Sequence, residues 1–171
     1  AFTQPSGHVY VNTGMGNDTI TVEQFSMTPA LVIDGGSGND VIVYEVQAGT
    51  SVQTITFGAG DIKLNSNTVL THANVESAKN LVIKATDGDD SVDLYAGGIG
   101  YYVSSSGTFA NIYFDASVQS LTIDLGQGTH DTMISHVGTS GEFAPALTIL
   151  ADDTSSDSDY LNLGSGNYSR L

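Results

Sequence analysis

Short apolar segments recur along the chain, and each precedes a stretch rich in Gly, Asn, Asp or Ser. The apolar segments are Val9-Tyr10-Val11, Leu31-Val32-Ile33, Leu81-Val82-Ile83, Leu121-Thr122-Ile123 and Leu147-Thr148-Ile149. Runs of β-branched and apolar residues bounded by turn-forming residues are typical of strands. The pattern therefore predicts a repeated strand–turn–strand unit.

A second strand follows most of these turns, and its residues alternate between apolar and polar. A period of two places one set of side chains on one face of a strand. We therefore expect Ile20/Val22, Ile42/Tyr44 and Val92/Leu94 to form inward-facing ladders. Residues 69–82 come closest to a helical period, but their β-branched residues and their match to residues 112–123 favour strand and corner. No helix is expected.

The repetition favours a solenoid over a β-sandwich, whose strands differ from one another. The leading strands at 31, 81 and 121 lie about 50 and 40 residues apart, which corresponds to two coils of roughly 20–25 residues each. We expect an all-β parallel β-helix (a β-solenoid) with irregular coils of this length. Residues 1–171 are expected to form a single domain, as a whole protein or as a fragment or subunit of a larger repetitive assembly.

One turn matches a calcium-binding pattern at every specified position. Residues 35–43 read Gly-Gly-Ser-Gly-Asn-Asp-Val-Ile-Val and fit the nonapeptide G-G-x-G-x-D-x-U-x, in which U is a large apolar residue. Residues 13–21 miss only the first Gly. The sequence here resembles the calcium-binding repeats of the RTX family and the Gly-Asn-Asp-rich repeats of large secreted bacterial surface proteins. The resemblance implies that Ca²⁺ lies between two turns stacked in adjacent coils.

Candidate metal ligands follow from the chemistry of these turns. Glycine permits the positive φ of a tight corner, and carboxylate and carbonyl oxygens are the hard ligands that Ca²⁺ prefers. Asp18 and Asp40 are 22 residues apart, which fits successive coils. A metal-free ladder is the alternative, because Asn and Asp side chains also bond to their own backbone in turns. The candidate ligands are Gly14, Gly16, Asn17, Asp18, Gly36, Gly38, Asn39, Asp40, Asp89 and Asp90.

Further copies of the turn follow, and their spacing departs from the tandem repeats of the family. A third copy begins the segment 88–94, weaker copies begin the segments 129–134 and 158–163, and residues 57–64 look like a copy shortened by one residue. We expect the turns to stack along one edge of the solenoid.

The charge of the chain narrows the choice of partners. It carries 4 Lys and Arg against 19 Asp and Glu, so the formal net charge is −15. Nucleic acid and anionic membrane surfaces bind clustered basic residues, and no apolar run reaches the roughly 18 residues of a membrane span. We expect no nucleic acid partner, no membrane insertion and a divalent cation, Ca²⁺, as the first partner. Cysteine is absent, which excludes disulfides and thiolate metal sites.

These features predict a non-enzymatic module, secreted or held at the cell surface, in a surface layer, a matrix filament or an adhesin stalk. Exposed strand edges at uncapped ends favour end-to-end self-association. The alternatives are a carbohydrate-binding or carbohydrate-active β-helix of the lyase or epimerase kind, with surface glycans as ligands, and an ice-binding surface. Four scattered basic residues and the lack of a nucleophile elbow argue against an enzyme, so no catalytic residue is expected.

Overall fold

The computed structural model shows an all-β protein, with no helix among the residues that it describes. These are residues 7–23, 31–97, 100–106, 108–128, 130–136, 145–151 and 159–163. Their strands form two sheets, built mainly of parallel pairs. The all-β prediction is confirmed, and so is the prediction of strand and corner for residues 69–82, which span the end of β7, the turn 74–76 and the start of β8.

The two sheets differ in size. The larger sheet has ten strands in the order β1 (Val9–Asn12), β3 (Leu31–Asp34), β7 (Asn67–Ala73), β6 (Asp61–Leu64), β5 (Gln53–Phe57), β11 (Ile112–Asp115), β10 (Gly100–Ser105), β9 (Ser91–Gly97), β13 (Thr132–Ser135) and β15 (Tyr160–Asn162). The smaller sheet has five strands in the order β14 (Ala146–Leu150), β12 (Ser120–Asp124), β8 (Ser77–Lys84), β4 (Val41–Gln47) and β2 (Thr19–Glu23).

Two strands of the larger sheet interrupt its parallel pairing. β6 and β10 run antiparallel to both of their neighbours. Residues 57–64, expected to be a shortened Asp turn, instead form the β5–β6 hairpin, in which Gly58 N–H donates to Asp61 O at 2.8 Å. That expectation is wrong because so short a connection reverses the chain within one sheet and does not carry it to the other.

Turns carry the chain between the two sheets at both ends of the strands. Where the structure describes the connection, the chain leaves the larger sheet after β1, β3, β7 and β11, and it leaves the smaller sheet after β4, β8 and β12. We name the row of turns that leave the larger sheet the first edge. The row of turns that leave the smaller sheet is the second edge. Because each turn follows the carboxyl end of its strand, the two edges lie at opposite ends of the strands.

The expectation that the Asp turns stack along one edge is wrong. Turns 13–18 and 35–40 lie on the first edge, whereas turns 85–90 and 125–131 lie on the second. The apolar segments that precede these turns divide in the same way between the larger and the smaller sheet. The Asp turns shift from the first edge to the second because the β5–β6–β7 hairpins add strands to the larger sheet alone. The next strand, β8, then pairs with β4 in the smaller sheet, with Tyr44 opposite Leu81.

The apolar faces of the two sheets contact each other and form one core cluster. The predicted inward ladders are confirmed, with Ile20 half-buried at the N-terminal end. The fully buried members are Val22, Ile42, Tyr44, Val92 and Leu94. Burial of such apolar ladders is the main stabilising contribution to the fold.

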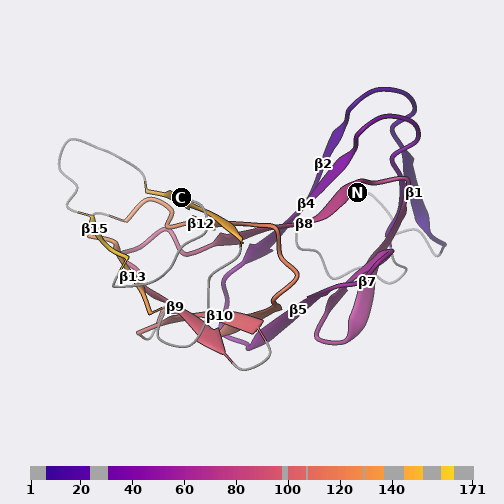
Figure 1. Cartoon of the computed structure of the whole chain (residues 1–171). Coiled ribbons are helices and arrows are strands. Elements are labelled where there is room, and N and C mark those ends of the chain that lie inside the picture. Colours follow the sequence, from indigo (N-terminus) through magenta and orange to yellow (C-terminus); the bar gives the residue numbers. More distant parts are fainter. Residues whose placement is uncertain are drawn as a thin grey trace, which may run out of the picture.

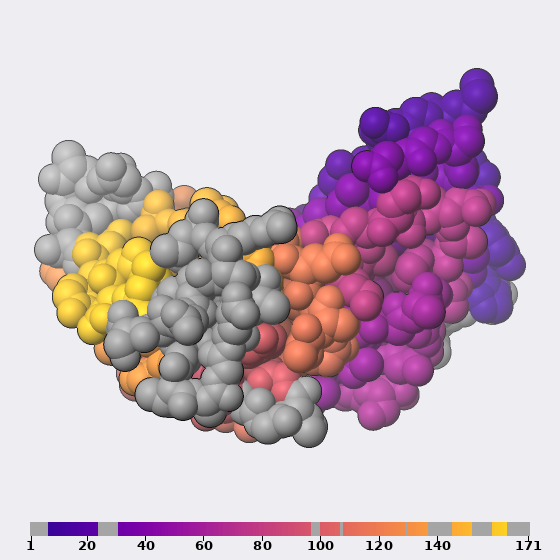
Figure 2. All heavy atoms as spheres, viewed as in Figure 1, coloured from indigo at the N-terminus to yellow at the C-terminus, as the bar shows by residue number. Residues whose placement is uncertain are grey.

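The unequal sheets give the molecule an arched shape. Neighbouring strands lie about 4.8 Å apart, so ten strands span about 43 Å and five strands span about 19 Å. Figure 1 shows β7, β5, β10 and β9 along the outer side of the arch and β12, β8 and β4 along its inner side. The chain advances from one end of this arch to the other, as the colours of Figure 2 show.

Candidate metal site

The two turns that best match the calcium pattern lie in direct contact on the first edge. Ser37 N–H donates to Gly14 O, and Gly16 N–H donates to Ser37 O, both at 2.9 Å. The flanking strands pair in register, with Leu31 beside Val9 and Val41 beside Thr19. The 22-residue spacing of these turns is therefore the advance from one unit to the next, as expected.

Glycine is required where one turn rests on the other. Gly36 has a φ of 88°, and a Cβ on it would overlap Gly14 O; Gly38 faces Gly16 O in the same way. Gly14 has a φ of 90°, but a Cβ on it would meet nothing within 4 Å. The two glycines thus share one backbone conformation, but a neighbouring turn fills the space beside Gly36, whereas the space beside Gly14 is open.

Carboxylates join successive units of the first edge into a ladder. Asp18 N–H donates to Asp40 Oδ1 at 2.8 Å, and Asp40 N–H donates to Glu76 Oε2 at 2.5 Å. Asn39 N–H donates to Asn17 Oδ1 at 2.9 Å beside this ladder. Each carboxylate therefore holds the backbone amide of the preceding unit, which is the metal-free ladder that the sequence left open.

The second edge carries a ladder of the same kind. Asp90 N–H donates to Asp131 Oδ1 at 2.8 Å, and Asp131 N–H donates to Asp159 Oδ1 at 3.1 Å. Asp90 Oδ2 also accepts the N–H and the Oγ1–H of Thr86, both at 2.8 Å. The copies that looked weakest in the sequence are therefore neighbours in one stack.

One position in each unit supplies the ladder residue. The residue immediately before the second strand is Asp18, Asp40, Glu76, Asp90, Asp131 or Asp159. Sequence reasoning missed Glu76, whose turn has no Gly-Asn-Asp motif. It recognised the turns of Asp131 and Asp159 as weaker copies but did not include these two residues among the candidate ligands. An acidic residue directly ahead of an alternating strand is the signal that finds all six.

The predicted ligands separate into two places. Eight of them, from Gly14 to Asp18 and from Gly36 to Asp40, lie together in the two stacked turns of the first edge. Asp89 and Asp90 lie on the second edge, and only Asp90 belongs to a ladder. Asp89 is exposed and accepts the His130 N–H at 3.2 Å.

Four ladder aspartates each bury one carboxylate oxygen that has no hydrogen-bond partner among the described residues. These oxygens are Asp18 Oδ2, Asp40 Oδ2, Asp90 Oδ1 and Asp131 Oδ2. Asp40, Asp90 and Asp131 are at most 1% exposed. Burial raises the pKa of Asp131, and the nearby carboxylates raise it further against the opposing effect of the Asp90 N–H. Each such oxygen is costly to bury unless a proton or a cation neutralises it.

In comparisons with known proteins, no family model, curated protein or solved structure matches the chain. No helix in the described part of the chain has the length and apolar character needed to cross a membrane.

The donor set of the turns fits Ca²⁺ by its chemistry, since it consists of hard, partly anionic oxygens. Within the described residues, no three His, Asp or Glu side chains converge on one point. A cation held by Asp40 or Asp131 would therefore draw its other ligands from turn carbonyls and water. Gly14 O and Gly35 O each accept one protein hydrogen bond, from Ser37 N–H and Thr13 Oγ1–H, and keep a second lone pair.

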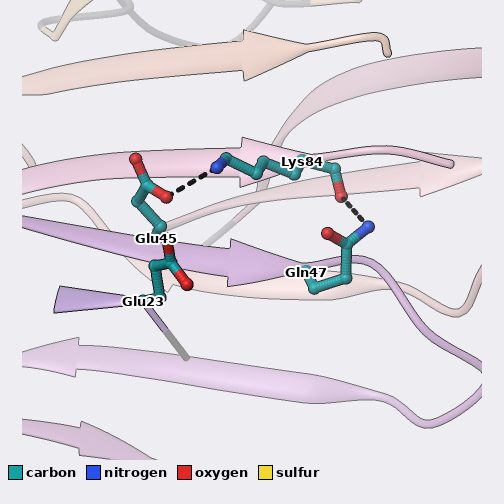
Figure 3. A pocket seen from close by; sticks show the side chains of 4 residues that line it. All are labelled: Glu23, Glu45, Gln47 and Lys84. Atoms are coloured by element: carbon teal, nitrogen blue, oxygen red, sulfur yellow. Dashed lines mark hydrogen bonds and ion pairs between the residues drawn. The ribbon is translucent and has the colours of Figure 1, made fainter. Parts of the chain in front are cut away.

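A shallow hollow on the outer face of the smaller sheet contains the lysine that an enzyme would need. Figure 3 shows Lys84 Nζ paired with Glu45 Oε2 at 2.7 Å, beside Glu23 and Gln47. The hydrogen bond that Lys84 donates to Glu45 is the main cause that raises the pKa of Lys84. Lys63 is likewise paired with Asp61, at 3.2 Å. A catalytic base needs a lowered lysine pKa, so the chemistry of this hollow does not suit proton abstraction.

Aromatic rings form a row across the outer face of the larger sheet. Tyr95 stacks on Tyr102 at 4.9 Å and on His136 at 4.5 Å, and Tyr102 lies 5.3 Å from Tyr113. Because stacked rings cover each other's faces, the row presents ring edges to solvent over most of its length. Sugars stack on ring faces, so this row is better suited to stabilising the sheet across its strands than to binding a glycan.

Proposed function

We propose that this chain is a non-enzymatic structural or adhesive module of the cell surface or the extracellular space, built as a parallel β-helix. The observation that carries the proposal is the pair of carboxylate ladders, in which four bonds of the same direction join an acidic residue to the backbone amide of the unit before it. Parallel register between units and the alternation of the chain between two sheets support the β-helix. The RTX-like turn at 35–43 supports the extracellular setting.

Calcium stabilisation is part of this proposal. The ladders place carboxylates in rows, and the formal net charge of −15 opposes their packing. Ca²⁺ would neutralise the buried free oxygens of Asp40 and Asp131 and draw adjacent turns together. It would supply no chemistry beyond this electrostatic cross-link.

The paired states of Lys63 and Lys84 favour the structural module over a lyase or epimerase. The stacked aromatic row favours it over a glycan-binding surface. An ice-binding face would need a regular outward Thr array, whereas Val43 and Val82 lie beside Thr21 and Thr122 in the smaller sheet. The structural module is the function that these observations support best.

Thermal melts with Ca²⁺ and with chelator test the proposal. A ligand at 100 times its Kd that binds only the folded state adds about 2.7 kcal/mol, which corresponds to a rise of about 5–10 °C for a domain of this size. Asp40→Asn and Asp131→Asn keep an acceptor oxygen but remove the charge, so each should lose part of the rise. Asp89→Asn, outside the ladders, should keep it.

An unchanged melting temperature on addition of Ca²⁺ contradicts the calcium part and leaves a metal-free ladder. We propose that the module also associates end to end, and negative-stain microscopy tests this self-association. Only monomers at high protein concentration with Ca²⁺ contradict self-association, and turnover of an acidic polysaccharide contradicts the non-enzymatic assignment.

A further inference from the structure

The two ends of the molecule expose more apolar surface than its body. Among the described residues, the exposed large apolar side chains are Tyr10, Met15, Val52, Tyr113, Leu150, Tyr160 and Leu161. Five of these seven belong to the first strand and its turn or to the last strand of each sheet. A gathering of exposed apolar side chains at the ends is typical of surfaces that bind a partner.

The ladders have a direction, and it leaves complementary groups at the two ends. In all four ladder bonds, the amide belongs to the N-terminal unit and the carboxylate to the C-terminal unit. Among the described residues, nothing donates to the Asp18 carboxylate at the start, and nothing accepts from the Asp159 N–H at the end. One end therefore lacks a donor, and the other lacks an acceptor.

The turn at the N-terminal end is also open on its outer side. Gly14 and Gly16 have the positive φ of Gly36 and Gly38, but space remains where those two glycines meet a neighbour. The inward residues Val9, Val11 and Ile20 are half-buried, whereas their neighbours in the next unit are buried. This end is therefore shaped to receive one more strand–turn–strand unit.

We propose that this unit is the C-terminal end of a second copy of the chain, turned by half a rotation about the long axis of the molecule. The inference rests on the end-to-end association proposed above and states its geometry. It places β1 beside β14 and β2 beside β15 of the other copy. Asp18 then accepts the Asp159 N–H, and Ile20 covers the exposed Leu161.

The half rotation follows from strand direction. Strands of the two sheets run in opposite directions, because a single turn connects them, and a half rotation about the long axis exchanges both the sheets and the directions. β1 then runs parallel to β14, β2 runs parallel to β15, and turn 13–18 meets the second edge, where Asp159 lies. Without the rotation, Asp18 and Asp159 lie on opposite edges. Contact between two N-terminal ends would set one donor-deficient carboxylate against another.

This arrangement also determines the shape of the assembly. A contact between different surfaces of identical subunits produces an open filament unless the rotation closes a ring. Because each copy is turned by half a rotation, successive arches face opposite sides. The bend of one copy is cancelled by the next, and the filament follows a straight axis.

Single-cysteine variants test the geometry cleanly, because the chain has no cysteine of its own. Within one chain, the residue that follows a ladder Asp pairs with the residue that follows the next ladder Asp. The same register across the joint sets Thr21 beside Asn162 of the other copy. Neighbouring strands lie about 4.8 Å apart, within disulfide range. Thr21→Cys and Asn162→Cys, mixed with Ca²⁺ under mild oxidation, should give a mixed disulfide in excess over both homodimers.

Two other pairs report the alternatives. Tyr10→Cys with Asn162→Cys reports the arrangement without rotation, and a Thr21→Cys homodimer reports contact between two N-terminal ends. Efficient cross-linking of either of these two pairs, in place of Thr21→Cys with Asn162→Cys, overturns the proposed geometry. Self-association itself would still stand.

A matched pair of charge substitutions tests the surface independently. Leu161 and Val52 are 52% and 57% exposed, one at the end and one in the body. Leu161→Asp should abolish filaments, and Val52→Asp should leave them. Equal assembly of the two variants overturns the proposal. A calcium-dependent melt of monomeric Leu161→Asp checks the module separately, so loss of docking is distinguished from failure of the proposed function.

Discussion

Replacing Gly36 by Ala tests whether the stacking of turns is what requires glycine, and Gly14→Ala is the matched control. The two glycines have φ values of 88° and 90°, so Ala suffers the same backbone strain at either position. That strain is about 1–2 kcal/mol, and the stiffer unfolded chain offsets about 0.4–1 kcal/mol of it. Gly14→Ala should therefore cost about 1 kcal/mol of unfolding free energy.

Gly36→Ala adds a collision with Gly14 O, which is a rigid backbone atom. The turns must separate by more than about 1 Å to relieve the overlap. That movement stretches the two 2.9 Å hydrogen bonds between Ser37 and residues Gly14 and Gly16 out of range. Each such bond contributes about 0.5–1.5 kcal/mol. The total loss for Gly36→Ala is therefore expected at about 2–4 kcal/mol.

Urea unfolding at low protein concentration with chelator measures both variants as monomers. With a slope of about 2 kcal/mol per molar urea, Gly36→Ala should lower the midpoint by about 1–2 M and Gly14→Ala by about 0.5 M, with unchanged slopes. Equal losses for the two variants would refute the argument, because the strain at positive φ would then account for both and the contact between turns for neither.

Two further changes probe buried polar groups. Burial raises the pKa of Asp131, so the folded state favours its protonated form. The stability that this group contributes is present below its ordinary pKa of about 3.9 and is lost as pH rises through the raised value. Asp131→Asn should flatten this pH dependence in urea titrations between pH 4 and 7 with chelator, and an unchanged profile would contradict the expectation. Tyr44 buries a hydroxyl that has no partner among the described residues, and burial raises its pKa to about 12. Tyr44→Phe should therefore be neutral or stabilise the fold by up to about 1 kcal/mol. A loss of more than about 1 kcal/mol of unfolding free energy would show that the hydroxyl has a bonded partner.

Local patterns predicted much of this structure, because each depends on neighbours close in the sequence. Alternation placed Ile42 and Tyr44 in the core, and the 22-residue spacing predicted the contact between turns 13–18 and 35–40. The two edges could not be predicted in the same way. Hairpins at β5–β6 and β9–β10 decide which sheet the next repeat enters, and their effect depends on pairings between distant strands.

The sequence pattern did not predict the role of Glu76 for a related reason. Its turn, 74–76, has no glycine and no Gly-Asn-Asp motif, and only its place before β8 relates it to Asp40. A search for a metal motif looks for residue types that bend the chain around an ion. A search for a ladder looks instead for an acceptor at a constant position relative to the strand, which several turn shapes can supply.

The direction of the ladders has a consequence for how metal and assembly are related. Asp40 and Asp131 each use one carboxylate oxygen to hold the amide of the preceding unit and bury the other, so joining units gains a charge-assisted hydrogen bond while it adds a buried charge. A cation lowers the cost of that charge without competing for the oxygen that holds the amide. Ca²⁺ should therefore strengthen the joint between copies for the same reason that it strengthens the joint between units. Filaments should then lose end contacts in chelator before the monomers unfold, because the end joint lacks the covalent connection that holds the units of one chain together.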